Sequence, residues 1–67
     1  MYEIWVDEFD GRGMHYLTEY EAPQEIKAAL EVFRRLDTED GIKAEYCIYY
    51  VERYATDVTE DFEDYED

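Results

Sequence analysis

A single amphipathic helical segment, flanked on both sides by β-rich segments, constrains the fold of this chain more than any other feature. Ala22-Pro23 opens the segment, and apolar residues then recur at the spacing of one buried helix face. Proline is tolerated in a first helical turn, and Glu25 suits the positive end of the helix dipole. DTEDG (37–41) predicts the end of the helix, because Gly41 can adopt a left-handed turn. The apolar stripe consists of Ile26, Ala29, Leu30, Phe33 and Leu36.

The flanking segments have the composition of β-strands. Residues 2–9, YEIWVDEF, are rich in β-branched and aromatic types, and DGRG (10–13) then combines Asp-Gly with a second glycine, which favours a hairpin. A second strand is therefore expected from about Met14 to Tyr20. After the helix, residues 44–54, AEYCIYYVERY, predict a third and longest strand.

The order strand, strand, helix, strand predicts an α+β domain. A right-handed crossover through the helix places strand three beside strand one, which gives a three-stranded antiparallel sheet of order 2-1-3. One helix covers only one face of such a sheet. The other face would expose Trp5, Phe9 or several tyrosines as a patch typical of an interface, unless the C-terminal segment folds over it.

Residues 1–56 are expected to form this β-β-α-β domain, and residues 57–67 an acidic C-terminal segment. Val58, Phe62 and Tyr65 share one side of a helix, and Asp57 with Glu60 resembles a capping pair. The segment is therefore predicted to be either frayed or a short docked helix. Its removal is expected to weaken partner binding and to leave the fold largely intact.

The charge of the chain limits what it can bind. It has 67 residues with 20 Asp and Glu against 6 Lys and Arg, for a formal net charge of −14. A domain of this size has one small core, and such an imbalance destabilises it through self-repulsion. The charge also excludes the ordinary electrostatic route to DNA, RNA or anionic lipid. The expected partner is a basic protein surface or a cation.

Residue types that could support chemistry are sparse. His15 and Cys47 are the only histidine and cysteine, and a zinc site needs three or four ligands. Residues 36–47 fail the EF-hand pattern, which leaves only weak surface binding of divalent ions. A non-enzymatic protein without a cofactor is expected. One cysteine, no apolar leader and no long apolar run predict a cytoplasmic protein that does not enter a membrane.

The acidic residues are the candidate site. Same-face residues on a strand lie about 6.6 Å apart, the same order as neighbouring phosphates on a nucleic-acid strand, so carboxylates on a rigid sheet can imitate a phosphate row. The alternative is that the acids only keep a small domain monomeric, for which a net charge of about 2 to 8 is enough. The candidate partner-binding residues are Asp7, Glu8, Asp10, Glu19, Glu21, Asp37, Glu39, Asp40, Asp57, Glu60, Asp61, Glu63 and Asp64.

A short, strongly acidic, aromatic-rich chain without an enzyme motif resembles the phage and mobile-element antidefence proteins that act as DNA mimics. These include anti-CRISPR proteins, antirestriction proteins and uracil-DNA glycosylase inhibitors. The resemblance covers the whole chain in size, charge and β-β-α-β pattern. It implies stoichiometric inhibition of a basic nucleic-acid-binding protein in a bacterial host. The anti-CRISPR type is favoured, with a CRISPR effector subunit as the partner and a monomer or weak dimer as the inhibitor.

Two other functions remain open from the sequence. The chain is also compatible with an adaptor that binds one protein through Tyr and Trp anchors, since these residues are enriched at interface hot spots. A homo-oligomeric module that buries the open sheet face is the third interpretation. Salt separates the readings, because mimicry predicts a steep loss of affinity with added salt and an aromatic interface does not.

Overall fold

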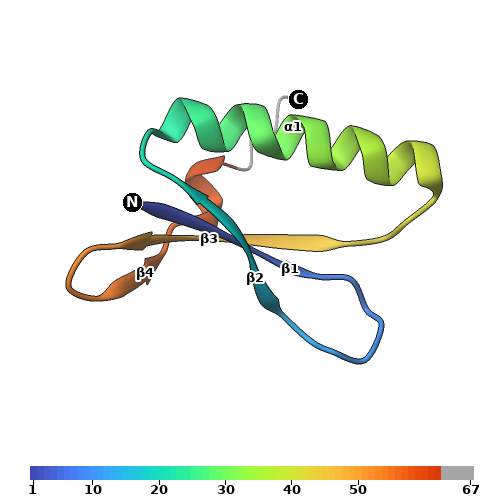
Figure 1. The fold of residues 1–67 in the computed structure, drawn as a ribbon, viewed down its shortest axis with the longest axis horizontal. Helices are drawn as coiled ribbons and strands as arrows, with labels where there is room; N and C mark the ends of the chain where they lie inside the picture. The colour runs from blue at the N-terminus through green and yellow to red at the C-terminus, as the bar shows by residue number, and fades with distance from the viewer. Residues whose placement is uncertain (63–67) are drawn as a thin grey trace.

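The computed structural model describes residues 1–62 as one antiparallel sheet with one long helix packed across a single face (Figure 1). The elements in chain order are β1 (Tyr2–Asp7), β2 (His15–Tyr20), α1 (Pro23–Asp40), β3 (Glu45–Val51), β4 (Ala55–Asp57) and the 3₁₀ helix η1 (Thr59–Phe62). The strand order is β2-β1-β3-β4. The predicted α+β class, the β1–β2 pairing and the return of the chain beside β1 after the helix are confirmed.

The expected number of strands, three, is corrected to four. The segment 44–54 does not run as one strand: β3 ends at Val51, the chain turns over residues 52–54, and β4 pairs antiparallel with β3. The turn contains Glu52, Arg53 and Tyr54 but neither glycine nor proline, so the composition held no turn signal there. β4 also crosses the boundary expected between residues 1–56 and 57–67.

The connection between β1 and β2 is longer than a tight hairpin turn. It covers residues 8–14, and Gly11 and Gly13 have positive φ angles of 94° and 73° within it. Asp10 accepts the backbone N–H of Arg12 at 3.1 Å, and this bond is the main cause that lowers the pKa of the Asp10 carboxyl. The Arg12 guanidinium forms ion pairs with Glu8 at 2.8 Å and with Asp10 at 2.9 Å. The single base of this loop is therefore engaged by its own neighbours.

The helix is capped at both ends by the signals in its sequence. The Glu25 carboxylate accepts the backbone N–H of Ala22 at 3.2 Å at the start. At the end Gly41 adopts a left-handed conformation with φ 69°, and its N–H donates to the Thr38 carbonyl at 3.2 Å. α1 continues through Asp40, so DTED belongs to the last helical turn rather than to a loop. That turn carries acids and no base, which opposes the helix dipole.

The core lies between the sheet and α1. Ile4 and Ile48 are register partners on adjacent strands, so they share the face that packs against Ile26 and Leu30 of the helix. Phe62 of η1 completes the cluster and is 7% exposed. These residues come from four separate elements, and burial of their side chains stabilises the contact of helix and sheet.

Residues 58–62 are part of this core rather than an appendage. Val58 donates its N–H to the Ile48 carbonyl at 2.8 Å, and the Ile48 N–H donates to Thr59 Oγ1 at 2.9 Å. The docked alternative is thus observed for η1, with Val58 and Phe62 packed as the spacing predicted. Tyr65 lies outside the described residues. The expectation that residues 57–67 can be removed with the fold intact conflicts with the burial of Phe62.

Candidate functional site

The sheet face opposite α1 is open, since no helix of residues 1–62 lies over it (Figure 1). Side chains alternate between faces along each strand, and register partners share a face. Ile4 points to the helix, so Trp5 points to the open face together with its partners Cys47 on β3 and Tyr16 on β2. The open face was expected to expose aromatic side chains, and Trp5 is at its centre.

An aromatic cluster, Trp5, Tyr16 and Tyr49, spans three strands of this face. The Trp5 ring lies 5.9 Å from the ring of Tyr16 and 6.1 Å from that of Tyr49, with interplanar angles of 81° and 85°. Both contacts are edge-to-face, a favourable arrangement for aromatic pairs. The Tyr16 side of the cluster is the more accessible, with 46% of that residue exposed.

A β-bulge in β2 brings Tyr16 into the cluster. Ile4 is paired with Thr18, whereas the next residue, Trp5, is paired with Tyr16, so Leu17 is one extra residue in β2. In a regular ladder Tyr16 and Thr18 would lie on the same face, the one under the helix. The sequence of β2 contains no glycine that would have indicated this shift.

Carboxylates surround the aromatic cluster. Glu3 and Glu19 are register partners across β1 and β2, and Asp7 and Glu45 are partners across β1 and β3. Asp57 of β4 is the partner of Tyr49 and completes this set of open-face carboxylates. In each of these two pairs, like charges therefore lie directly opposite each other on the open face. Such an arrangement destabilises a sheet.

Hydrogen bonds hold four of these carboxylates in place. Asp7 Oδ1 accepts the backbone N–H of Phe9 at 2.8 Å. Glu3 Oε1 accepts the indole N–H of Trp5 at 3.0 Å, and Glu19 Oε1 accepts the Tyr16 hydroxyl at 3.1 Å. Asp57 Oδ1 accepts the Thr59 N–H at 2.9 Å and its hydroxyl at 2.5 Å. The hydroxyl bond is the main cause that lowers the pKa of the Asp57 carboxyl. These carboxylates of the open face thus have defined positions.

The tyrosines of the open face stay neutral at physiological pH. Burial, followed by the hydrogen bond to Glu19 and the charges of Glu19 and Glu3, raises the pKa of Tyr16. Burial and the neighbouring Cys47 and Asp57 raise the pKa of Tyr49. Both phenols therefore remain hydrogen-bond donors on the open face.

Basic residues are excluded from the whole sheet. In the part of the chain that the structure describes, none of the four strands contains a lysine or an arginine. The bases lie instead on α1 and in the connections between elements, namely Lys27, Arg34, Arg35, Arg12, Lys43 and Arg53. The open face therefore presents uncompensated negative charge around an aromatic centre.

The acids proposed from sequence are distributed over several surfaces. Asp7, Glu19 and Asp57 lie on the open face, while Glu8 and Asp10 are in the β1–β2 loop beside Arg12. The remaining described candidates lie elsewhere: Glu21 between β2 and α1; Asp37, Glu39 and Asp40 at the end of α1; Glu60 and Asp61 on η1. Glu63 and Asp64 lie outside the described residues.

Two open-face carboxylates, Glu3 and Glu45, were missed among the sequence candidates. The alternation of β1 already placed Glu3 beside Trp5, so this signal was present in the sequence. The position of Glu45 opposite Asp7 depends on the β1–β3 register. Asp37 was included, and it accepts the Tyr46 hydroxyl at 2.6 Å beside the helix.

The residues with catalytic potential are kept apart. His15 is the partner of Val6 on the helix side of the sheet, whereas Cys47 is the partner of Trp5 on the open face. A Cys-His pair is therefore incompatible with this register. Within residues 1–62 no group of three or more His, Cys, Asp or Glu side chains is arranged to hold a metal ion. No helix in this part of the chain is both long and apolar enough to cross a membrane.

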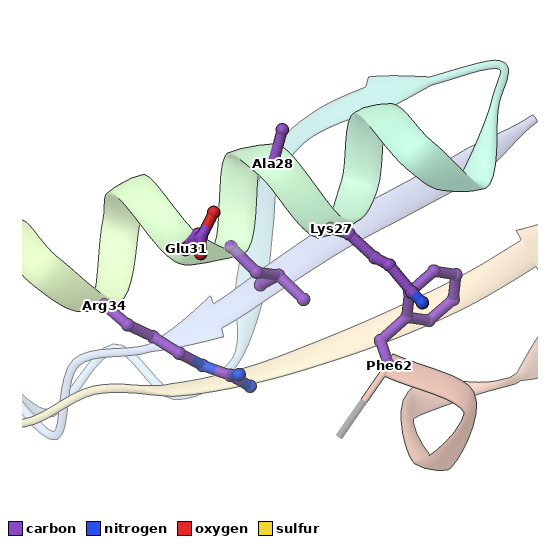
Figure 2. Close-up of a pocket in the computed structure, with 6 residues that line it drawn as sticks. Lys27, Ala28, Glu31, Arg34 and Phe62 are labelled. Carbon is purple, nitrogen blue, oxygen red and sulfur yellow. The ribbon is translucent and has the colours of Figure 1, made fainter. Parts of the chain in front are cut away.

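A hollow of about 510 Å³ lies on the other side of the molecule, between α1 and η1. Figure 2 shows Lys27 and Arg34 extending from the helix on the side where Phe62 of η1 lies, with Glu31 between them along α1. The described residues that line it include no serine, cysteine or histidine, so they offer no nucleophile paired with a base. This hollow has the opposite charge character to the open face.

Comparisons with protein-family models, with curated protein sequences and with solved structures found no matching protein.

Proposed function

We propose that this protein is an acidic, non-enzymatic inhibitor that mimics DNA and occupies the basic nucleic-acid-binding surface of another protein. One observation carries the proposal: the chain has a net charge of −14, and none of the four strands within residues 1–62 contains a lysine or an arginine. A charge that served only for solubility would need neither this magnitude nor this segregation.

The spacing of a sheet supports the mimicry. Carboxylates two residues apart on a strand lie about 6.6 Å from each other, and neighbouring strands are about 4.8 Å apart. Lys and Arg side chains that hold a phosphate row can pair with carboxylates at such separations. Association then releases counterions from both surfaces, as DNA binding does.

The resemblance to phage and mobile-element antidefence proteins suggests the setting of this activity. We infer an anti-CRISPR type of inhibitor in the cytoplasm of a bacterial host, with a CRISPR effector subunit as the favoured partner. The support consists of size, charge and the β-β-α-β order of the first four elements. The inhibitor would act by stoichiometric occupation, without turnover.

A second candidate function has support from the aromatic cluster. Trp5, Tyr16 and Tyr49 form a central patch of the kind that anchors protein interfaces, which fits an adaptor or a self-associating module. In that case the acids would only surround the contact, and binding would be driven by apolar burial.

The dependence of partner affinity on salt separates the two functions. A partner captured from a bacterial lysate is purified, and its dissociation constant is measured at about 50 mM and about 200 mM NaCl. Mimicry predicts a loss of affinity of at least about tenfold over this range. Equal affinity at the two salt concentrations favours the aromatic interface and rejects the mimic.

A further inference from the structure

We propose that the open face binds an arginine-bearing segment of the partner, with a guanidinium group beside Trp5 and paired with Glu3 and Glu19. This proposal rests on the proposed function in one respect, that the partner surface is basic. It goes further by assigning the contact to one face of the sheet and to one type of side chain.

The like-charged pairs of the open face indicate a cationic occupant. Glu3 opposes Glu19, and Asp7 opposes Glu45, in direct register. Opposed carboxylates on adjacent strands repel each other, and in the free protein no strand offers a base to separate them. A cation placed between two such carboxylates relieves the repulsion. A positively charged ligand therefore stabilises the protein most when it binds at these positions.

The shape of the open face suits a long side chain. A hollow of about 300 Å³ is lined by Glu3, Trp5, Met14, Tyr49 and Ala55. This volume is at the lower end of the range for small-molecule sites, about 300 to 1,000 Å³. Its lining combines apolar and aromatic surface with one carboxylate. An arginine buries its aliphatic stem on such apolar surface while its charged head pairs at the edge.

Arginine fits the arrangement better than lysine. A guanidinium is planar, stacks on aromatic faces and pairs with a carboxylate through two parallel hydrogen bonds. Tyr16 of the cluster is 46% exposed, so aromatic surface next to Trp5 is accessible to a cation. Glu3 is held at the indole by the Trp5 N–H, which places a carboxylate next to that ring.

The single tryptophan of the chain allows a direct test. Trp5 fluorescence is followed while deca-arginine or deca-lysine is added at low salt. The open-face variant Glu3→Gln/Glu19→Gln loses two charges. Its glutamine amide oxygens can still accept the hydrogen bonds from Trp5 and Tyr16. The matched control, Glu31→Gln/Glu52→Gln, loses the same number of charges from exposed positions in α1 and in the turn between β3 and β4.

The expected result is a change in Trp5 emission with tighter binding of deca-arginine than of deca-lysine. The open-face variant should bind deca-arginine about fivefold or more weakly, and the control less than about twofold more weakly. An equal loss in the two variants overturns the assignment to the open face and leaves the proposed function standing. Equal affinity for the two peptides overturns the choice of arginine. Absence of binding of either peptide contradicts both this inference and the proposed function.

Discussion

Glu3 and Glu19 oppose each other across β1 and β2, on sheet strands that contain no lysine or arginine. Directly opposed like charges on adjacent strands destabilise a sheet by a few tenths of a kcal/mol to about 1 kcal/mol. The free protein therefore tolerates a repulsion on its open face that a basic partner would remove. Natural proteins commonly keep such unfavourable arrangements where function needs them.

Glu19→Gln should stabilise the free protein, because it removes one charge of this opposed pair and keeps an oxygen that accepts the Tyr16 hydroxyl. The expected gain is about 0.5 kcal/mol in the free energy of unfolding, measured by urea denaturation at neutral pH. Glu52→Gln is the control for general loss of charge, because Glu52 is exposed and likewise accepts a tyrosine hydroxyl, that of Tyr50, at 3.1 Å. If Glu19→Gln gains no more than the control, the repulsion between Glu3 and Glu19 is not significant.

Phe62→Ala should unfold a large share of the molecules. Phe62 is 7% exposed, packs in the core and meets Tyr2 edge-to-face at 5.7 Å. Loss of a buried phenylalanine costs about 3 to 5 kcal/mol, comparable with the whole stability expected of so small a core. Circular dichroism during thermal unfolding measures the effect, and Tyr54→Ala, at a residue that is 76% exposed, is the control. Similar melting temperatures for the two variants would show that η1 does not contribute to the core.

Added NaCl should raise the melting temperature in low-salt buffer at neutral pH. At a net charge of −14 the acidic side chains repel one another. Salt screens this repulsion effectively once the Debye length falls to about 10 Å, near 0.1 M salt. The increase should disappear near pH 4.1, the sequence isoelectric point, where net repulsion is absent. A melting temperature that is flat or decreasing with salt at neutral pH would mean that the acids are paired or well dispersed.

Stability should fall at alkaline pH, and Tyr46 should account for part of the fall. Burial and the hydrogen bond to Asp37 raise the pKa of Tyr46, so the folded state binds its proton more tightly than the unfolded state does. The stabilisation is complete below the unfolded pKa of about 10 and is lost as the pH rises above it. Urea denaturation between about pH 8 and 11 measures the effect.

Tyr46→Phe provides the control for this titration. The variant should lose about 1 kcal/mol at neutral pH with the hydrogen bond to Asp37, and it should show a smaller alkaline decrease than the wild type. Other tyrosines with raised pKa values, Tyr16, Tyr49 and Tyr50, account for the remaining decrease. An alkaline decrease of equal size in the variant would exclude Tyr46 as a contributor.

The fold was largely predictable because its signals are local. The stripe from Ile26 to Leu36 and the left-handed Gly41 define α1, and the handedness of the crossover places β3 beside β1. The break between β3 and β4 was not predictable in the same way, since Glu52, Arg53 and Tyr54 are not turn-forming types. The turn there joins two strands that pair with each other, β3 and residues 55–57.

The open face was predictable in outline, and its carboxylate pairs were not. Alternation along β1 puts Glu3, Trp5 and Asp7 on one face. The partners of those residues depend on register, and register depends on contacts between segments distant in the sequence and on the bulge at Leu17. The clusters of acids that stand out in the sequence, such as residues 37–40, lie instead at the end of α1.

Competition between this protein and duplex DNA for one partner tests the central claim most directly. The dissociation constant of the purified partner for this protein is measured at fixed low salt with increasing concentrations of duplex DNA. DNA mimicry predicts that the apparent dissociation constant rises in proportion to the DNA concentration, because the two ligands exclude each other from one basic surface. An affinity that stays unchanged at saturating DNA would contradict the account.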